Sequence, residues 1–179
     1  KRAKKDPSGA WAAVKEMADL EGEQFFTSRD PVGATPLHLC IVCGEFEMCK
    51  KLVMHCERPL PHSSTRRVVN TAVQFFQEGQ EDDNYVGKYD GENLLHMAIV
   101  NQDPKFAEWL LRRHYDAATH SEKPGGSGLT ALLEQKAIGS FFARDVGPCY
   151  YGEYPILFAV ASNQPKMVDL CMKYGGDTQ

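Results

Sequence analysis

The sequence predicts a mostly α-helical fold, a solenoid of stacked helix pairs joined by long projecting loops. Two observations lead to this fold class. A short motif occurs three times, in residues 30–40, 90–98 and 152–159, and an amphipathic helical pattern follows each copy. In addition, 42% of the 179 residues are hydrophobic and 25% are charged, which is typical of an ordered chain that can bury a core of its own.

Residues 1–8 are predicted to be a basic tail. Four of the first five residues are basic, and no apolar segment of the signal-peptide kind follows them. Because the chain begins with Lys, we expect it to be a piece of a longer protein. The folded domain is expected to span residues 9–179, and its first part, residues 9–29, predicts a divergent, shortened helix pair that covers the first full repeat.

The first motif copy combines residues that start a helix directly after a tight turn. Gly33 suits a backbone with positive φ, Thr35 can cap the helix, and Pro36 fits its first position, where no N–H donor is needed. His38 can hydrogen-bond back to the turn. In the later copies the corresponding residues are Gly91, Asn93, His96, Gly152 and Pro155. Since Tyr154 is a poor cap, we expect packing rather than capping to hold the third copy.

The three copies resemble the start of an ankyrin repeat. The distance from Gly33 to Gly91 is 58 residues and that from Gly91 to Gly152 is 61, against ~33 in a standard ankyrin unit. Repeats are therefore expected to start near residues 30, 88 and 151, each with a long insertion. The insertions, about residues 59–89 and 115–151, predict an ankyrin-repeat solenoid of helix pairs with long finger loops.

Residues 128–133 imitate a further repeat start. They lie only 24 residues before Gly152, which is too few for a complete unit. We therefore expect this segment to belong to the second finger.

Charge and hydropathy exclude two classes of function. The chain has 20 basic and 24 acidic residues, so no general attraction to nucleic acid is expected. Its longest apolar stretches, residues 94–100 and 155–161, are about a third of the ~20 residues that a membrane span requires. Of the six cysteines, four lie in helix-like sequence at apolar spacing, and reduced thiols are expected.

Residues 137–142 and 147–159 resemble the third finger and fourth repeat of the cytosolic domain of vanilloid-type transient receptor potential (TRPV) channels. Residues 89–99 are similar to that family's third repeat start. The resemblance implies a non-catalytic N-terminal module of a tetrameric cation channel, such as a calcium channel of sensory transduction, on the cytoplasmic side of the plasma membrane. The implied partners are neighbouring subunits, in a homo- or heterotetramer, and calmodulin in some members. The membrane would be reached only through a channel portion outside this chain.

The two fingers carry the candidate interface. Its residues are Phe75, Phe76, Tyr89, Phe141, Phe142, Arg144, Tyr150 and Tyr151. Neighbouring side chains of an extended hairpin point to opposite faces, so one ring of the Phe141–Phe142 pair is expected to pack inward and the other to face outward as an interface anchor. In the alternative, a twist in the loop buries both rings.

We expect no cofactor and no tight ATP binding. Nucleotide-binding members of the family use lysines where this chain has Ala34 and Leu39. Glu92 replaces their usual Gln, although Tyr89 matches the aromatic residue that packs on the base.

A metal site is not expected either. Cys40, Cys43, Cys49 and His38 invite a zinc hypothesis, but Cys40 and Cys49 hold apolar helix positions, which favours core packing. A nucleophile pair of Cys149 with His114 or His120 has no third orienting group suggested by spacing. The family resemblance implies a module that binds and does not catalyse, so we predict no enzyme. Two other functions stay open: a soluble ankyrin-repeat adaptor that recruits a protein partner, and a metal- or nucleotide-binding regulatory domain.

Overall fold

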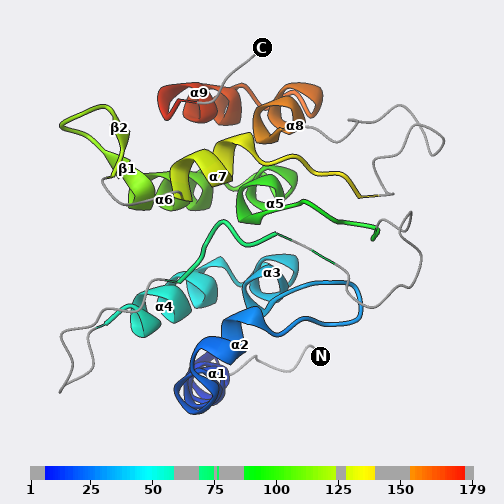
Figure 1. Ribbon diagram of the computed structural model, residues 1–179, viewed down its shortest axis with the longest axis vertical. Helices are drawn as coiled ribbons and strands as arrows, with labels where there is room; N and C mark the ends of the chain where they lie inside the picture. The colour runs from blue at the N-terminus through cyan, green and yellow to red at the C-terminus, as the bar shows by residue number, and fades with distance from the viewer. Residues whose placement is uncertain are drawn as a thin grey trace.

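The protein is a column of stacked helices (Figure 1). The structure, a computed structural model, describes residues 7–58, 69–74, 76, 87–123, 128–139 and 154–175. Its elements are α1 Pro7–Glu21, α2 Glu23–Thr27, α3 Pro36–Val42, α4 Phe46–Cys56, α5 Leu94–Val100, α6 Pro104–His114, β1 Tyr115–Asp116, β2 Ser121–Glu122, α7 Gly128–Glu134, α8 Pro155–Ala161 and α9 Pro165–Lys173. Strands β1 and β2 form a small antiparallel hairpin.

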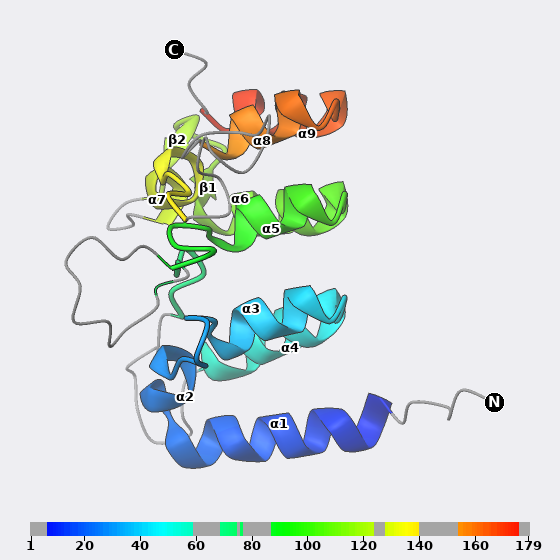
Figure 2. The ribbon, with the colours of Figure 1, turned by 90° about the vertical axis from the view of Figure 1, so that its right-hand side faces the viewer.

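Three helix pairs make up most of the column: α3 with α4, α5 with α6, and α8 with α9. Helix α5 packs against α3 on one side and α8 on the other, and α6 packs against α9. Figure 2 shows the pairs one above another, with the described bases of the long connections on one side of the helices. The predicted fold class, a mostly α-helical repeat solenoid, is confirmed.

The turn between the two helices has the same geometry in all three pairs. Gly44, Gln102 and Asn163 have φ angles of 71°, 55° and 53°. Their N–H groups donate to the carbonyls three residues earlier at 2.9, 2.9 and 3.0 Å, and the next N–H donates five residues back at 2.7, 3.0 and 2.9 Å. This Schellman motif satisfies carbonyls at the end of the first helix. Like the helix-start motif, it recurs after 58 and 61 residues.

The first helix starts with a capping box in two of the pairs. Nδ1 of His38 accepts a hydrogen bond from the N–H of Thr35 at 3.1 Å, and Nδ1 of His96 accepts one from the N–H of Asn93 at 3.2 Å. The Asn93 side chain also accepts two N–H groups of the first turn of α5, at 2.9 and 3.2 Å. Helix α8 begins with Pro155 and has no side-chain cap hydrogen bond.

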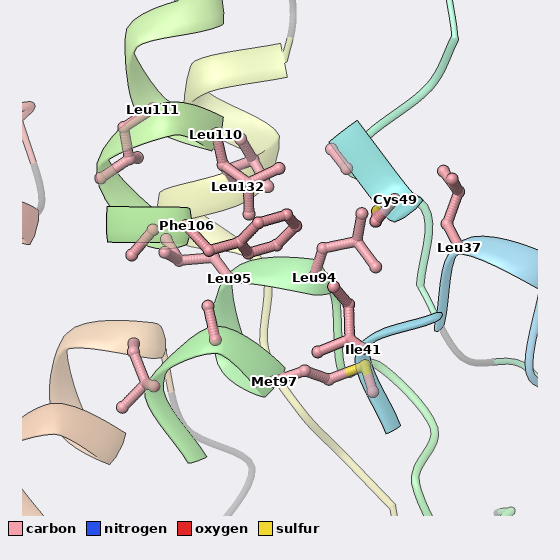
Figure 3. Packing of buried hydrophobic residues seen from close by; sticks show 14 of the residues in the cluster. Leu37, Ile41, Cys49, Leu94, Leu95, Met97, Phe106, Leu110, Leu111 and Leu132 are labelled. Carbon is pink, nitrogen blue, oxygen red and sulfur yellow. The ribbon is translucent and has the colours of Figure 1, made fainter. Parts of the chain in front are cut away.

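A continuous apolar core joins the pairs (Figure 3). Leu94 of α5 lies toward Ile41 of α3, and both side chains are fully buried. Phe106 of α6 is also fully buried, and its ring centroid lies 5.2 Å from that of Phe46 on α4. Burying one such side chain contributes about 1.5–3 kcal/mol, so each pair is stabilised mainly by its neighbours.

The N-terminal region differs from the expected shortened helix pair. Helix α1 is continuous from Pro7 to Glu21 and packs on α4, so it begins inside the predicted tail and takes up most of the region expected to form a pair. The Leu20 side chain is 83% exposed. The second helix, α2, has only 5 residues and buries Phe25. Helix α1 packs on α4 and the short α2 packs on α3, so the two helices together cover the first pair.

Helix α7 is the main departure from expectation, because residues 128–133 form a packed helix and not part of a projecting finger. The buried face of this helix consists of Leu129, Leu132 and Leu133. It packs against α5, α6 and α8. Glu122 accepts a hydrogen bond from the first turn of α7 at 2.8 Å, and the Asn93 amide donates to two carbonyls of α7 at 3.1 and 3.2 Å. The short segment therefore supplies one helix beside α5, without a second helix of its own.

The bases of the two long connections interlock with the turns of the repeats. The N–H groups of Ile138 and the next residue donate to the carbonyl of Asp90 at 2.8 and 2.9 Å. The Gln74 amide donates to the carbonyl of Gly91 at 2.9 Å, and the Arg29 guanidinium donates to the carbonyl of Gln74 at 2.8 Å. The main chain of three segments and the side chain of Arg29 thus meet at one edge of the column.

We predict that Gly91→Ala destabilises the protein far more than Gly44→Ala. Both glycines have positive φ, 84° and 71°, but a Cβ at position 91 would lie 2.1 Å from the carbonyl oxygen of Lys136, whereas one at position 44 meets no atom within 4 Å. The control Gly44→Ala should lower the free energy of unfolding by about 1–2 kcal/mol through backbone strain. Gly91→Ala should lower it by about 2 kcal/mol more, because its Cβ also clashes with the main chain. Urea denaturation measures both, and equal losses would contradict the close approach.

A second prediction concerns the turn of the second pair. Gln102 holds a left-handed backbone with φ of 55°, so Gln102→Gly should raise the free energy of unfolding by about 0.5–1 kcal/mol. Asn163→Gly is the matched control and should give a smaller gain, because asparagine tolerates this conformation better than glutamine. A loss of stability in Gln102→Gly would show that its side chain is needed.

Candidate functional site

An apolar groove of about 700 Å³ runs along the first helices of the three pairs. It is bounded by α3, α5 and α8 and by the turns that precede α3 and α5. Its apolar lining includes Val32, Ala34, Leu39, Val42, Tyr89, Met97, Ile99, Val100 and Phe158. Because each pair contributes the same edge, the groove exists only in the assembled column.

Part of this apolar lining faces solvent. Val32, Leu39, Val42 and Val100 are between 42% and 62% exposed, whereas Met97 and Phe158 on the floor are at most 5% exposed. Binding sites are typically concave and mostly apolar, and this groove has both properties. The groove is therefore the candidate functional site.

Glu92 is the most unusual residue of the groove. Its side chain lines the groove, and the residue is only 7% exposed. Burial away from water raises the pKa of its carboxyl group to about 7. Within the described ranges, no hydrogen bond or ion pair compensates this carboxylate. The groove thus contains an acidic group that water reaches poorly.

A second carboxylate lies at the end of the groove. Oδ1 of Asp30 accepts the N–H groups of Val32 and Ala34 at 3.0 and 2.8 Å, as is usual in a turn. Among the residues that line the groove there is no lysine, arginine or histidine. The charged side chains among its described lining residues, Asp30 and Glu92, are therefore both acidic.

The two motif histidines are structural groups of the repeat. His38 and His96 are fully buried. Burial lowers the pKa of His38 to about 4, so its ring is neutral near pH 7. The ring of His96 lies 4.9 Å from that of Phe158, edge to face, and so supports the groove floor from behind.

The predicted glycines and helix starts lie at the turns of the column. Gly33 and Gly91 have φ angles of 86° and 84°, and Pro36 and Pro155 begin α3 and α8. Gly152 lies outside the described residues. These glycines and prolines shape the turns at the edge of the groove, and their side chains carry no polar group that could contact a ligand.

Two of the predicted finger residues can be placed. Tyr89 is half-buried and lines the groove. Phe76 is 55% exposed and lies in a separate hollow of about 490 Å³, with the guanidinium carbon of Arg29 6.0 Å from its ring centre. The structure thus does not bring them into one site. The remaining predicted interface residues, Phe75, Phe141, Phe142, Arg144, Tyr150 and Tyr151, lie outside the described residues.

The described cysteines are all free thiols, namely Cys40, Cys43, Cys49, Cys56 and Cys171. Burial raises the pKa of Cys40 to about 11 and that of Cys171 to about 12, so neither is a reactive thiolate near pH 7. Across the described parts of the chain, no group of three or more His, Cys, Asp or Glu side chains is placed to hold a metal ion. Cys49 is fully buried on α4, in the core.

Comparison with known protein families identifies an ankyrin repeat at residues 32–61. The match includes α3 and α4, the first complete pair. The protein is therefore a mostly helical repeat solenoid that contains an ankyrin repeat. Ankyrin repeats are typically non-catalytic modules of protein–protein interaction, and an open apolar groove fits that class. None of the helices in the described ranges combines the length and apolar character needed to cross a bilayer.

Sequence reasoning missed the groove and the role of Glu92 in it. Val42 and Val100 were not among the predicted site residues, and Leu39 was named only as a position compared with a nucleotide site. Glu92 was noted only as a replacement for glutamine. The local sequence carries no signal for the burial of Glu92, because buried and exposed residues are direct neighbours elsewhere in these helices, as His38 and Leu39 show.

We predict that Glu92→Gln stabilises the protein at pH 8 and not at pH 4.5. The folded-state pKa of about 7 lies above the ordinary value of 4.5, so the folded protein binds more protons than the unfolded chain in this range and loses stability as pH rises through it. The gain in the free energy of unfolding at pH 8 should be up to about 3 kcal/mol.

The exposed Glu134→Gln is the matched control for the loss of one negative charge. Urea denaturation from pH 4.5 to 8 measures the difference between each variant and the parent. His38 makes the parent less stable toward acid, since its lowered pKa favours the unfolded state as pH falls, but this contribution cancels in the difference. A Glu92→Gln difference that does not change with pH would show that the carboxylate is well solvated.

Proposed function

We propose that this chain is the cytosolic N-terminal interaction and assembly module of a TRPV-like tetrameric cation channel. In this proposal the domain lies on the cytoplasmic side of the plasma membrane and contacts neighbouring subunits of a homo- or heterotetramer. Calmodulin is a further candidate partner. The domain acts by binding and has no catalytic role.

The proposal is supported by the long spacing of the repeats and by the hydrogen-bonded main chain at the bases of the two fingers. The helix-start motif recurs after 58 and 61 residues, and not after the ~33 residues of a standard ankyrin unit. The main chain at the bases of both long connections is hydrogen-bonded into the column, as the contacts of Asp90 with residues 138 and 139 illustrate. These long insertions, together with the motifs of residues 89–99, 137–142 and 147–159, are the features by which the sequence resembles the TRPV family.

A soluble ankyrin-repeat adaptor is the second candidate. The open apolar groove favours it, because such a groove can bind a protein segment without any channel. The complete protein separates the two functions: the channel requires a membrane-spanning region downstream of this chain that assembles as a tetramer, and the adaptor requires none.

We predict that Phe76→Ala weakens assembly of the complete protein and leaves the stability of this domain nearly unchanged. The ring is 55% exposed at a finger base, so its removal should change the free energy of unfolding by less than about 0.5 kcal/mol. If the ring is an interface anchor, tetramer formation should weaken about tenfold or more.

Leu20→Ala is the control for the loss of an exposed apolar side chain, because Leu20 is 83% exposed on α1. Thermal unfolding of this domain and crosslinking of the full-length protein in membranes provide the two measurements. Equal assembly of both variants and the parent would mean that the finger base at Phe76 is not a subunit contact.

A further inference from the structure

The groove combines an apolar surface with negative charge. Aliphatic side chains form its rim, and its described charged groups are the carboxylates of Asp30 and Glu92. The two acids are not equivalent. Asp30 already accepts two hydrogen bonds from its own turn, whereas Glu92 has none among the described residues.

Glu92 is suited to a cation that comes from outside the domain. A carboxylate taken out of water is unfavourable unless it is paired and hydrogen-bonded, and the described groove offers no basic side chain for this purpose. An ammonium or guanidinium group would supply both the charge and the donors. An anionic ligand such as a triphosphate would instead be repelled.

The rim indicates that the cation is attached to an apolar body. Leu39 and Val42 of α3 and Val100 of α5 expose 42%, 62% and 60% of their surface around the groove. The aliphatic stem of a lysine or arginine packs on such surface while its charged end reaches a carboxylate. Because exposed apolar residues come from two successive repeats and from the turn before α3, they can contact several neighbouring side chains of one segment.

We propose that the groove binds a segment of a partner protein that inserts one lysine or arginine side chain toward Glu92 and packs flanking apolar side chains on Leu39, Val42 and Val100. The proposal rests on the role of the domain as an interaction module. It does not depend on membership of a channel. It specifies a basic and apolar partner segment for the groove.

A selection from random 12-residue peptides displayed on phage tests the proposal. The 179-residue chain, its Glu92→Gln variant and the control Glu134→Gln are immobilised in parallel at pH 7.5. The parent and the control should enrich peptides with a lysine or arginine among aliphatic or aromatic residues, and Glu92→Gln should lose this preference for a basic residue. Since Glu92→Gln is expected to be more stable than the parent at this pH, unfolding would not explain the loss.

The best peptide is then synthesised with its basic residue and with norleucine in that place. Fluorescence anisotropy should show that norleucine weakens binding to the parent at least tenfold and changes binding to Glu92→Gln much less, which is the coupling expected of a direct pair. Hexylammonium chloride at the same concentration should not displace the peptide.

Several outcomes would overturn the proposal: no enriched peptides, enrichment without basic residues, equal effects of norleucine in both proteins, or displacement by hexylammonium, which would indicate a site for small amines. These results do not depend on the assembly of the full-length protein. If the peptide experiments fail, the channel proposal is unaffected. If the crosslinking experiment fails, the proposed specificity of the groove is unaffected.

Discussion

Burial of each helix pair against the next is the constraint on which the whole structure depends. Helix α5 has 7 residues, six of which are buried, between α3, α6 and α8. An isolated helix of this length is unstable in water, and two such helices cannot cover each other completely. A first helix of this kind is therefore stable only in a stack, where neighbouring helices cover the apolar side chains on both of its faces.

The same burial dictates the polar chemistry of the motif. Thr35, His38, Asn93 and His96 are fully buried, so their hydrogen-bonding groups must be satisfied inside the protein. The histidine rings accept the N–H groups of the cap residues, and Asn93 also reaches the carbonyls of α7. These contacts fix the direction in which each first helix leaves its turn. The first helices α3, α5 and α8 consequently lie side by side, with the same edge of each facing the groove.

The groove follows from this arrangement. Glu92 precedes the buried cap Asn93 by one residue, so the geometry that starts α5 also carries the carboxylate of Glu92 into an apolar surrounding. Its raised pKa is the electrostatic consequence. The stack thus produces two features together, an exposed aliphatic rim and an acidic group with poor access to water. This combination makes the groove a candidate for selective recognition.

The sequence by itself determined the local rules of the fold. Residues three positions apart, such as Thr35 and His38 or Asn93 and His96, identified the helix starts, because capping depends on groups within one helical turn. The motif spacing likewise predicted three pairs with long connections. Only the tertiary structure decided that residues 128–134 pack as α7, that α1 runs unbroken to Glu21, and that Glu92 lines a groove with Leu39 and Val42. Those outcomes depend on surfaces of separate elements that meet in the folded chain, and local sequence patterns do not encode how much water such surfaces exclude.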